Sequence, residues 1–296
     1  MPFLDSPGRC VYCAATDGLT NEHIIPASLG GKLILESSSC LNCQRITGRF
    51  EEIVARNMYW PLRLSLGIRG GRKRKKKAPT HWRGIVVDDE TGQEDSFEIE
   101  VGKFPRFYAT VEMPPPGIIN DLPPTDKSPE LKLYLKADRE GLKAFVESLG
   151  ASSYEIGLNW RWDAFNQLLA KIAHAYSAGL AGFDGIEYLL PPLIVGGSAC
   201  FSYLIGGIDD PSQELEPPAD IQLNYRKIRG ELYLSVKTTI FGNKRFPTYE
   251  IISGRITDLD LVRRKIAVAQ EHIARDNAVS RANAESAPGE FLRADP

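Results

Sequence analysis

The sequence lacks the features that mark exported, membrane-spanning or nucleotide-binding proteins. No apolar run approaches the ~20 residues that a helix needs to cross a bilayer. The first nine residues contain Pro, Asp and Gly in place of the long apolar stretch of a signal peptide. The sequence also contains no phosphate-binding loop, dinucleotide fingerprint or internal repeat. We therefore expect a cytoplasmic protein with no membrane partner and no ATP site.

An excess of positive charge is also missing. The 296 residues include 36 Lys and Arg against 38 Asp and Glu, which gives a formal net charge of −2. A chain with this balance does not bind nucleic acid through its overall charge, so any such binding must come from a local patch. The hydrophobic share of 43% and the charged share of 25% are typical of globular proteins. The length allows about two domains.

Cysteine is scarce, but four of the five cysteines form two pairs with the spacing Cys-x2-Cys. Cys10 with Cys13 and Cys40 with Cys43 can together bind one tetrahedral zinc ion, which would be structural because no coordination position stays open. Two disulfides, or unrelated buried thiols, are the alternatives. A reducing compartment favours the zinc site. Cys200 stands alone and is expected to be a small core residue.

The segment between and after the cysteine pairs has patterns typical of two strands and a helix. The expected elements are a strand over residues 19–25, a second strand over residues 32–35 and a helix that starts at residue 41. Pro26 ends the first strand, and the pair Gly30-Gly31 permits a tight turn. Ser38 or Ser39 can cap the helix. Two residues near the end of the first strand, Glu22 and His23, are expected to face this helix.

This order of residues resembles a known family. Two Cys-x2-Cys pairs enclosing Glu22-His23-Ile-Ile-Pro26 and Gly30-Gly31 are similar to the HNH endonucleases of the ββα-metal type, in the branch with a zinc-binding cysteine frame. The resemblance covers Cys10 to about Glu52. It implies hydrolysis of nucleic-acid phosphodiester bonds with one catalytic divalent ion. It further implies that His23 is the general base for the attacking water and that Glu22 is a ligand of the ion.

The chemistry of the reaction asks for the same residue types. Hydrolysis of a phosphodiester needs a cation to offset negative charge and a base that titrates near neutrality, which histidine supplies. Carboxylate and amide oxygens suit Mg²⁺ or Mn²⁺, whereas thiolates suit zinc. The sequence therefore predicts two metals, a structural Zn²⁺ and a catalytic Mg²⁺ or Mn²⁺.

One position departs from the family pattern. Gln44 follows the last cysteine, where the family usually has Asn or His as the second ligand of the catalytic ion. Its amide oxygen can still bind the ion, but a misplacement of about 1 Å can cost a hundredfold in rate. The family's middle Asn is also absent from residues 34–39. Glu51, roughly 10 Å further along the helix axis, is a conceivable replacement.

Six consecutive cations follow this module, and they are expected to form a solvated arm that contacts phosphates. They are Arg72, Lys73, Arg74, Lys75, Lys76 and Lys77. A solubilising loop, or in a eukaryote a nuclear-import signal, is the alternative reading of this run.

The remainder is expected to be a mixed α+β domain with antiparallel sheet. The expected elements are a hairpin and a further strand over residues 81–113, a strand and a helix over 131–149, a helix over 163–180, a meander over 221–253 and a helix from Thr257. Lys171 is expected to lie off the apolar face of its helix, and the other histidines receive no role. The predicted organisation is a nuclease module over 1–58, a basic linker over 59–80, an α+β domain over 81–275 and a loose tail over 276–296.

Three functions are consistent with these patterns. The favoured function is a metal-dependent HNH-type endonuclease whose substrate is nucleic acid, with DNA favoured over RNA. The alternative is a non-catalytic zinc module that binds nucleic acid or protein and has a degenerate nuclease site. The third is a zinc-stapled protein without a nucleic-acid role. The role of the second domain, the oligomeric state and the sequence preference do not follow from the sequence.

Overall fold

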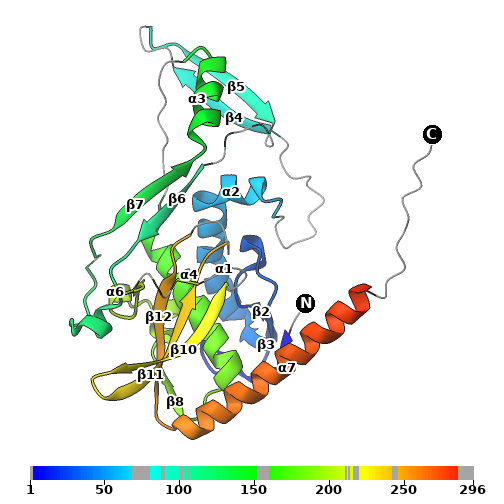
Figure 1. Ribbon diagram of the computed structural model, residues 1–296, viewed down its shortest axis with the longest axis vertical. Helices are drawn as coiled ribbons and strands as arrows, with labels where there is room; N and C mark the ends of the chain where they lie inside the picture. Colours follow the sequence, from blue (N-terminus) through cyan, green and yellow to red (C-terminus); the bar gives the residue numbers. More distant parts are fainter. Residues whose placement is uncertain are drawn as a thin grey trace.

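The computed structural model combines helices with mainly antiparallel sheets, which confirms the α+β fold class (Figure 1). It describes residues 3–68, 81–87, 91–100, 103, 105, 107–127, 129–151, 160–210, 212, 214–215, 220–241 and 246–285. The basic run 72–77 lies outside the described residues. Within these ranges no helix is long and apolar enough to span a membrane.

The N-terminal module is a small sheet followed by a helix. Strand β2 (Leu19–His23) pairs antiparallel with β3 (Ile34–Cys40), and β1 (Phe3–Leu4) adds to the other side of β3 in parallel. Helix α1 (Leu41–Ile53) follows β3 directly. The predicted order of strand, strand and helix is confirmed. The second strand begins two residues later than expected and runs to Cys40, and β1 was not predicted.

The start of α1 differs from the prediction. The N-cap is Cys40, whose Sγ accepts a hydrogen bond from the Cys43 amide at 3.5 Å. Ser38 and Ser39 were the predicted caps, but they lie within β3, where the Ser38 hydroxyl donates to the Leu35 carbonyl. One cysteine of the second pair thus also satisfies an amide at the start of the helix.

Helix α1 continues into a π-helical turn, η2 (Val54–Met58), and then a short helix α2 (Trp60–Ser65). The sequence predicted that Trp60 and Pro61 would end the motif helix. Instead α1 ends earlier, and Trp60 begins α2.

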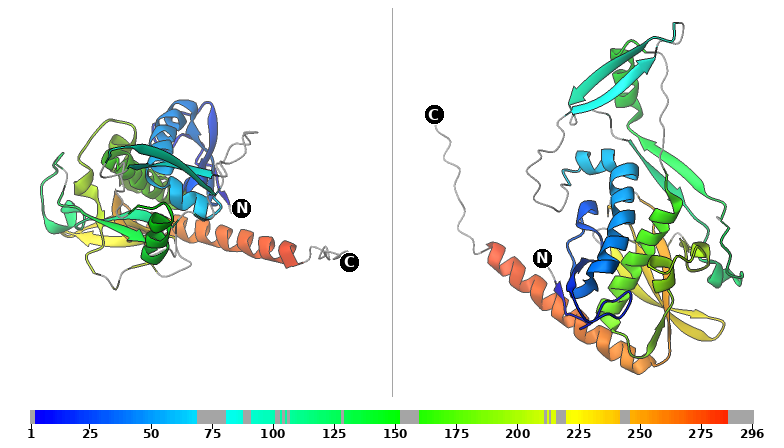
Figure 2. Two further views of the ribbon diagram at one scale, coloured as in Figure 1. Left: turned by 90° about the horizontal axis from the view of Figure 1, so that it is seen from above. Right: turned by 180° about the vertical axis from the view of Figure 1, so that it is seen from behind.

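The middle of the chain forms two hairpins and a helix that extend away from α7 (Figures 1 and 2). The elements are β4 (His81–Val87), β5 (Glu94–Glu100), β6 (Phe107–Glu112), η4 (Gly117–Asn120), β7 (Lys132–Ala137) and α3 (Arg139–Ser148). β4 pairs antiparallel with β5, and β6 pairs antiparallel with β7. The predicted hairpin and the predicted strand and helix over 131–149 are confirmed.

A second sheet and a long helix form the centre of the molecule. The sheet contains β8 (Ile186–Tyr188), β9 (Ile205–Gly207), β10 (Ile221–Ile228), β11 (Glu231–Thr238) and β12 (Tyr249–Ile256), all paired antiparallel. Two short helices, α5 (Pro191–Ile194) and α6 (Phe201–Leu204), lie between β8 and β9 in the sequence. The predicted meander over 221–253 is confirmed.

Helix α4 (Trp162–Ala181) contacts both the N-terminal module and this second sheet (Figure 2). Fifteen of its residues are buried, and its apolar side chains belong to one hydrophobic core that also contains residues of the module and of the sheet. The predicted core helix is confirmed. The prediction that Lys171 lies off the buried face is wrong, because its side chain is fully buried.

Helix α7 (Leu259–Glu285) closes the described chain. Asp258 caps its start, since its carboxylate accepts from the Leu261 amide at 3.0 Å; the sequence predicted that this helix would begin at Thr257. The helix continues to Glu285, well into the segment for which the sequence predicted a loose tail.

Candidate metal centre and active site

The first cysteine pair lies in a tight turn before β2. The Cys10 amide donates to the Ala15 carbonyl at 2.7 Å, and the Ala14 amide donates back to the Cys10 carbonyl at 2.9 Å. Ala14 takes a left-handed backbone conformation with φ of 61°. A further bond from the Val11 amide to the Ser38 carbonyl, at 2.8 Å, ties the turn to β3. Cys10 and Cys13 are thereby brought beside the second pair.

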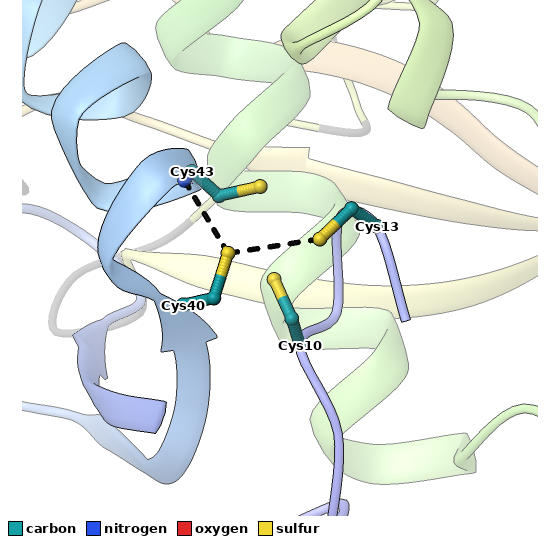
Figure 3. A group of neighbouring side chains, drawn as sticks. All are labelled: Cys10, Cys13, Cys40 and Cys43. Atoms are coloured by element: carbon teal, nitrogen blue, oxygen red, sulfur yellow. Dashed lines mark hydrogen bonds between the residues drawn. The ribbon is translucent and has the colours of Figure 1, made fainter. Parts of the chain in front are cut away.

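The four cysteines converge on one point, as the spacing predicted (Figure 3). Their Sγ atoms all lie within 4.8 Å of one another. The Sγ atoms of Cys13 and Cys40 are 3.6 Å apart. Four zinc–thiolate bonds of about 2.3 Å in tetrahedral geometry place the sulfurs about 3.8 Å apart, so the cluster fits one zinc ion. Cys200 lies outside the cluster, and all five cysteines are free thiols.

The surroundings of the thiols differ. The main-chain amide of Cys43 donates to the Cys40 sulfur, and this hydrogen bond lowers the pKa of Cys40 to about 7. Burial raises the pKa of Cys43 and of Cys13. A bound Zn²⁺ would supply the positive charge that holds all four groups as thiolates. Cys10, Cys40 and Cys43 are buried and Cys13 is exposed, so the centre lies just below the surface.

His23 is the last residue of β2, where it pairs with Ile34 of β3. Its side chain is half-buried, and its Nδ1 atom is buried without a hydrogen-bond partner among the described residues. Burial, and then the nearby Lys171 ammonium, lower the pKa of His23, and Glu22 partly opposes this shift. The imidazole is therefore biased toward its neutral form, in which it can accept a proton.

The loop after His23 is held by close packing. A Cβ atom on Gly31 would lie 1.8 Å from the Ile25 carbonyl oxygen, so only glycine fits there. On the other side, the Arg63 guanidinium donates to the carbonyls of Ser28 and Ala55. The loop is thus packed against its own first residues and linked to η2 through Arg63.

The ammonium of Lys171 reaches the same strand end from α4. Its Nζ atom lies 2.6 Å from Glu22 Oε1 and 3.0 Å from Glu51 Oε1. It also donates to the carbonyls of His23 and, at 3.3 Å, Ile24. Burial works to lower the pKa of Lys171, but the two carboxylates prevail and raise it. Burial raises the pKa of Glu51, and Lys171 opposes that shift.

The two ligands predicted for the divalent ion lie in different settings. Glu22 is 6% exposed and paired with Lys171, whereas Gln44 is exposed on the first turn of α1. Among the described His, Cys, Asp and Glu side chains, the four cysteines form the single group of three or more whose ligand atoms converge. The described arrangement therefore does not fit a divalent ion held through Glu22.

The other histidines lie in three different environments. His174 is buried in α4, and its Nε2 atom lies 2.6 Å from the Val11 carbonyl oxygen. His272 of α7 lies on the surface, with Nδ1 3.2 Å from a carboxylate oxygen of Asp5. His81 begins β4.

Sequence reasoning missed Lys171 and His174 as parts of the site's support. Both belong to a helix composed almost wholly of apolar and small residues, which predicts burial on every side. A lysine and a histidine in such a helix must find partners, because an unpaired buried charge is costly. That composition was the available signal.

The comparisons with known proteins agree with this geometry. The HNH endonuclease family model matches residues 10–58, which contain all four converging cysteines together with Glu22, His23, Gln44 and Glu51. Searches of the curated proteins and of the solved structures found no match. The N-terminal part of this chain, residues 10–58, is thus a module of the HNH endonuclease family with a four-cysteine zinc frame.

Proposed function

We propose that this protein is an endonuclease that hydrolyses phosphodiester bonds of nucleic acid, DNA in preference to RNA, with His23 as the general base. The observation that carries the proposal is the position of His23. It lies half-exposed at the end of β2, inside the residues that match the HNH endonuclease family and on the strand that pairs with the cysteine-bearing β3.

In the proposed reaction His23 takes a proton from a water molecule as the water oxygen bonds to phosphorus. The bond from phosphorus to one ester oxygen breaks, and that oxygen leaves with the electron pair and is protonated by solvent. The zinc frame takes no part in this step. It holds the turn at Cys10 and the start of α1 together, so that the strand carrying His23 has a fixed neighbour.

The reaction class also calls for Mg²⁺ or Mn²⁺, which offsets charge on the phosphoryl and leaving oxygens. The family resemblance implies Glu22 and Gln44 as its ligands. Since Glu22 is paired with Lys171 in the described arrangement, no step of the mechanism is assigned to the ion.

The same pairing favours a second candidate, a zinc-framed module that binds nucleic acid without cutting it. A Glu22 paired with an ammonium and a glutamine after the last cysteine would both follow from loss of the catalytic ion site. Cleavage separates the two candidates, since both predict binding.

The test is cleavage of supercoiled plasmid, single-stranded DNA and RNA by the full chain with Mg²⁺ or Mn²⁺. The variants are His23→Ala and, as a matched control, His272→Ala, which removes a surface histidine of α7. We expect metal-dependent cutting by the wild type and the control, and its loss in His23→Ala by about a hundredfold or more. Equal inertness of all three proteins on every substrate would leave the binding module as the better account.

A further inference from the structure

The Lys171 ammonium lies in a cage made of oxygen atoms. Two are carboxylate oxygens, from Glu22 at 2.6 Å and Glu51 at 3.0 Å. Two are main-chain carbonyl oxygens, from Ile24 at 3.3 Å and from His23 at a shorter distance. Charged and neutral oxygens in this mixture are the ligands that hard cations bind in proteins.

The cage is largely shielded from solvent. The Lys171 side chain is 0% exposed, and those of Glu22 and Glu51 are 7% and 22% exposed. A buried ammonium needs a counter-charge, and a buried carboxylate needs a cation, so the groups are mutually required. A second cation could not share the cage with the ammonium, because like charges a few ångströms apart repel strongly away from water.

The cage also joins two distant parts of the chain. Lys171 is 148 residues from His23, and its helix packs on both α1 and the second sheet. By accepting from the ammonium, the His23 and Ile24 carbonyls fix the backbone where β2 ends. The orientation of the His23 imidazole therefore depends on a residue outside the nuclease module.

We propose that the Lys171 ammonium, and not a divalent metal ion, is the cation that Glu22 holds in this chain. This makes Lys171 a positioning residue for His23, a role that rests on the function proposed above. The inference explains why Glu22, the acidic residue that the family resemblance assigns to the catalytic ion, is buried and paired.

The first test measures Mn²⁺ binding by electron paramagnetic resonance in the zinc-loaded full chain. Glu22→Gln is compared with the wild type and with Glu52→Gln, which removes an exposed carboxylate of α1 beside Glu51. We expect all three proteins to bind Mn²⁺ equally, or equally not at all. A loss of tenfold or more in Mn²⁺ affinity confined to Glu22→Gln would overturn the proposal.

The second test measures the coupling between Lys171 and Glu22. Lys171→Met and Glu22→Gln are each expected to lower Tm by on the order of 10 °C, since the first leaves two carboxylates without their cation and the second leaves the buried ammonium with Glu51 alone. The double variant should lose clearly less than the sum of the two single losses. Additive losses would overturn the proposal. If Lys171→Met does not fold, the Mn²⁺ comparison decides alone.

The positioning role has a separate readout where the wild type cuts DNA. The double variant is expected to lose about tenfold or more in kcat at unchanged KM, because His23 loses its main-chain anchor while the fold is kept. An unchanged kcat would overturn the positioning role. The Mn²⁺ and Tm tests use no DNA, so an inert wild type would reject the proposed function and leave the assignment of the cation standing.

Discussion

The Nε2 atom of His174 lies 2.6 Å from the main-chain oxygen of Val11, in the turn between the first two zinc-frame cysteines. His174 is one turn of α4 beyond Lys171, so the same helix binds the zinc turn through one residue and the end of β2 through the other. Both contacts end on backbone carbonyls. Helix α4 thereby supports the two chemically distinct parts of the HNH module at once.

The His174 contact predicts an acid-sensitive fold. Burial lowers the pKa of His174 from 6.5 to about 4, although the Val11 carbonyl partly opposes this shift. Below pH 6.5 the unfolded chain binds a proton at this residue that the folded chain binds only near pH 4. The contribution of the neutral His174 to the free energy of unfolding is fully present above pH 6.5. It is lost by ~1.4 kcal/mol per pH unit as the pH falls from there toward about 4.

The measurement is denaturant unfolding between pH 7.5 and 4.5 for the wild type and for His174→Gln, whose amide can donate to the same carbonyl. Tyr12 and Tyr188, the rings that face His174, do not ionise in this range because burial raises the pKa of both. Acid loss of zinc affects both proteins alike. We expect the variant to lose less stability than the wild type, and parallel pH profiles would contradict the assignment.

The zinc frame predicts a metal-dependent fold. A strong chelator should lower the Tm of the full chain, because free energy of zinc binding contributes to folding. The chain should contain one Zn²⁺, as measured by elemental analysis. Cys43→Ser should abolish that stoichiometry, since a closed site needs all four thiolates.

Cys200→Ser is the matched control for this prediction, because Cys200 lies outside the cluster and is only partly buried. It should keep the zinc and change Tm little. Equal zinc content in Cys43→Ser and Cys200→Ser would contradict a four-cysteine site.

The second glycine after the short helix η1 (Ala27–Leu29) predicts a steric effect on the loop that follows His23. Gly31→Ala should destabilise the protein by about 1–3 kcal/mol, because the new Cβ meets the Ile25 carbonyl oxygen at 1.8 Å and the loop must move. Gly48→Ala is the control, since its new Cβ would meet no atom within 4 Å and alanine favours the helix by about 1 kcal/mol. Chemical denaturation should show a lower free energy of unfolding for Gly31→Ala and a higher one for Gly48→Ala than for the wild type.

The zinc frame could be predicted from the sequence because its determinants are local. Two Cys-x2-Cys pairs set ligand spacing through adjacent covalent geometry, and Pro26 and the glycine pair mark the ends of the short elements. The strands and helices with strong periodicity, such as α4 and the meander of β10 to β12, were predictable for the same reason.

The charge cluster could not be predicted in this way. Glu22 and Glu51 meet a lysine from a helix far along the chain, and no local pattern encodes that contact. The cap at Cys40 was missed because serine is the common capping residue, whereas a metal-binding thiol takes that place here. In both cases tertiary structure decided what a local preference left open.

The basic run remains a prediction from the sequence, and it gives a quantitative test. If the cations of residues 72–77 contact phosphates, each one releases counterions, and the slope of log K against log salt falls by about 0.9 per contact on duplex DNA. Replacing three of the six cations by Gln should therefore change the slope by about half as much as replacing all six. Binding is measured by fluorescence anisotropy with labelled DNA between low and moderate salt.

The variants with three and with six replaced cations distinguish a phosphate-contacting arm from a solubilising loop. A solubilising loop predicts that neither variant changes the affinity or the slope at any salt concentration, and the same result would support a protein without a nucleic-acid role. Because His23→Ala keeps all six cations, it should bind DNA with the wild-type slope even where it no longer cuts. A loss of binding in His23→Ala as well would instead mean that the module takes part in binding and that the arm does not act separately from it.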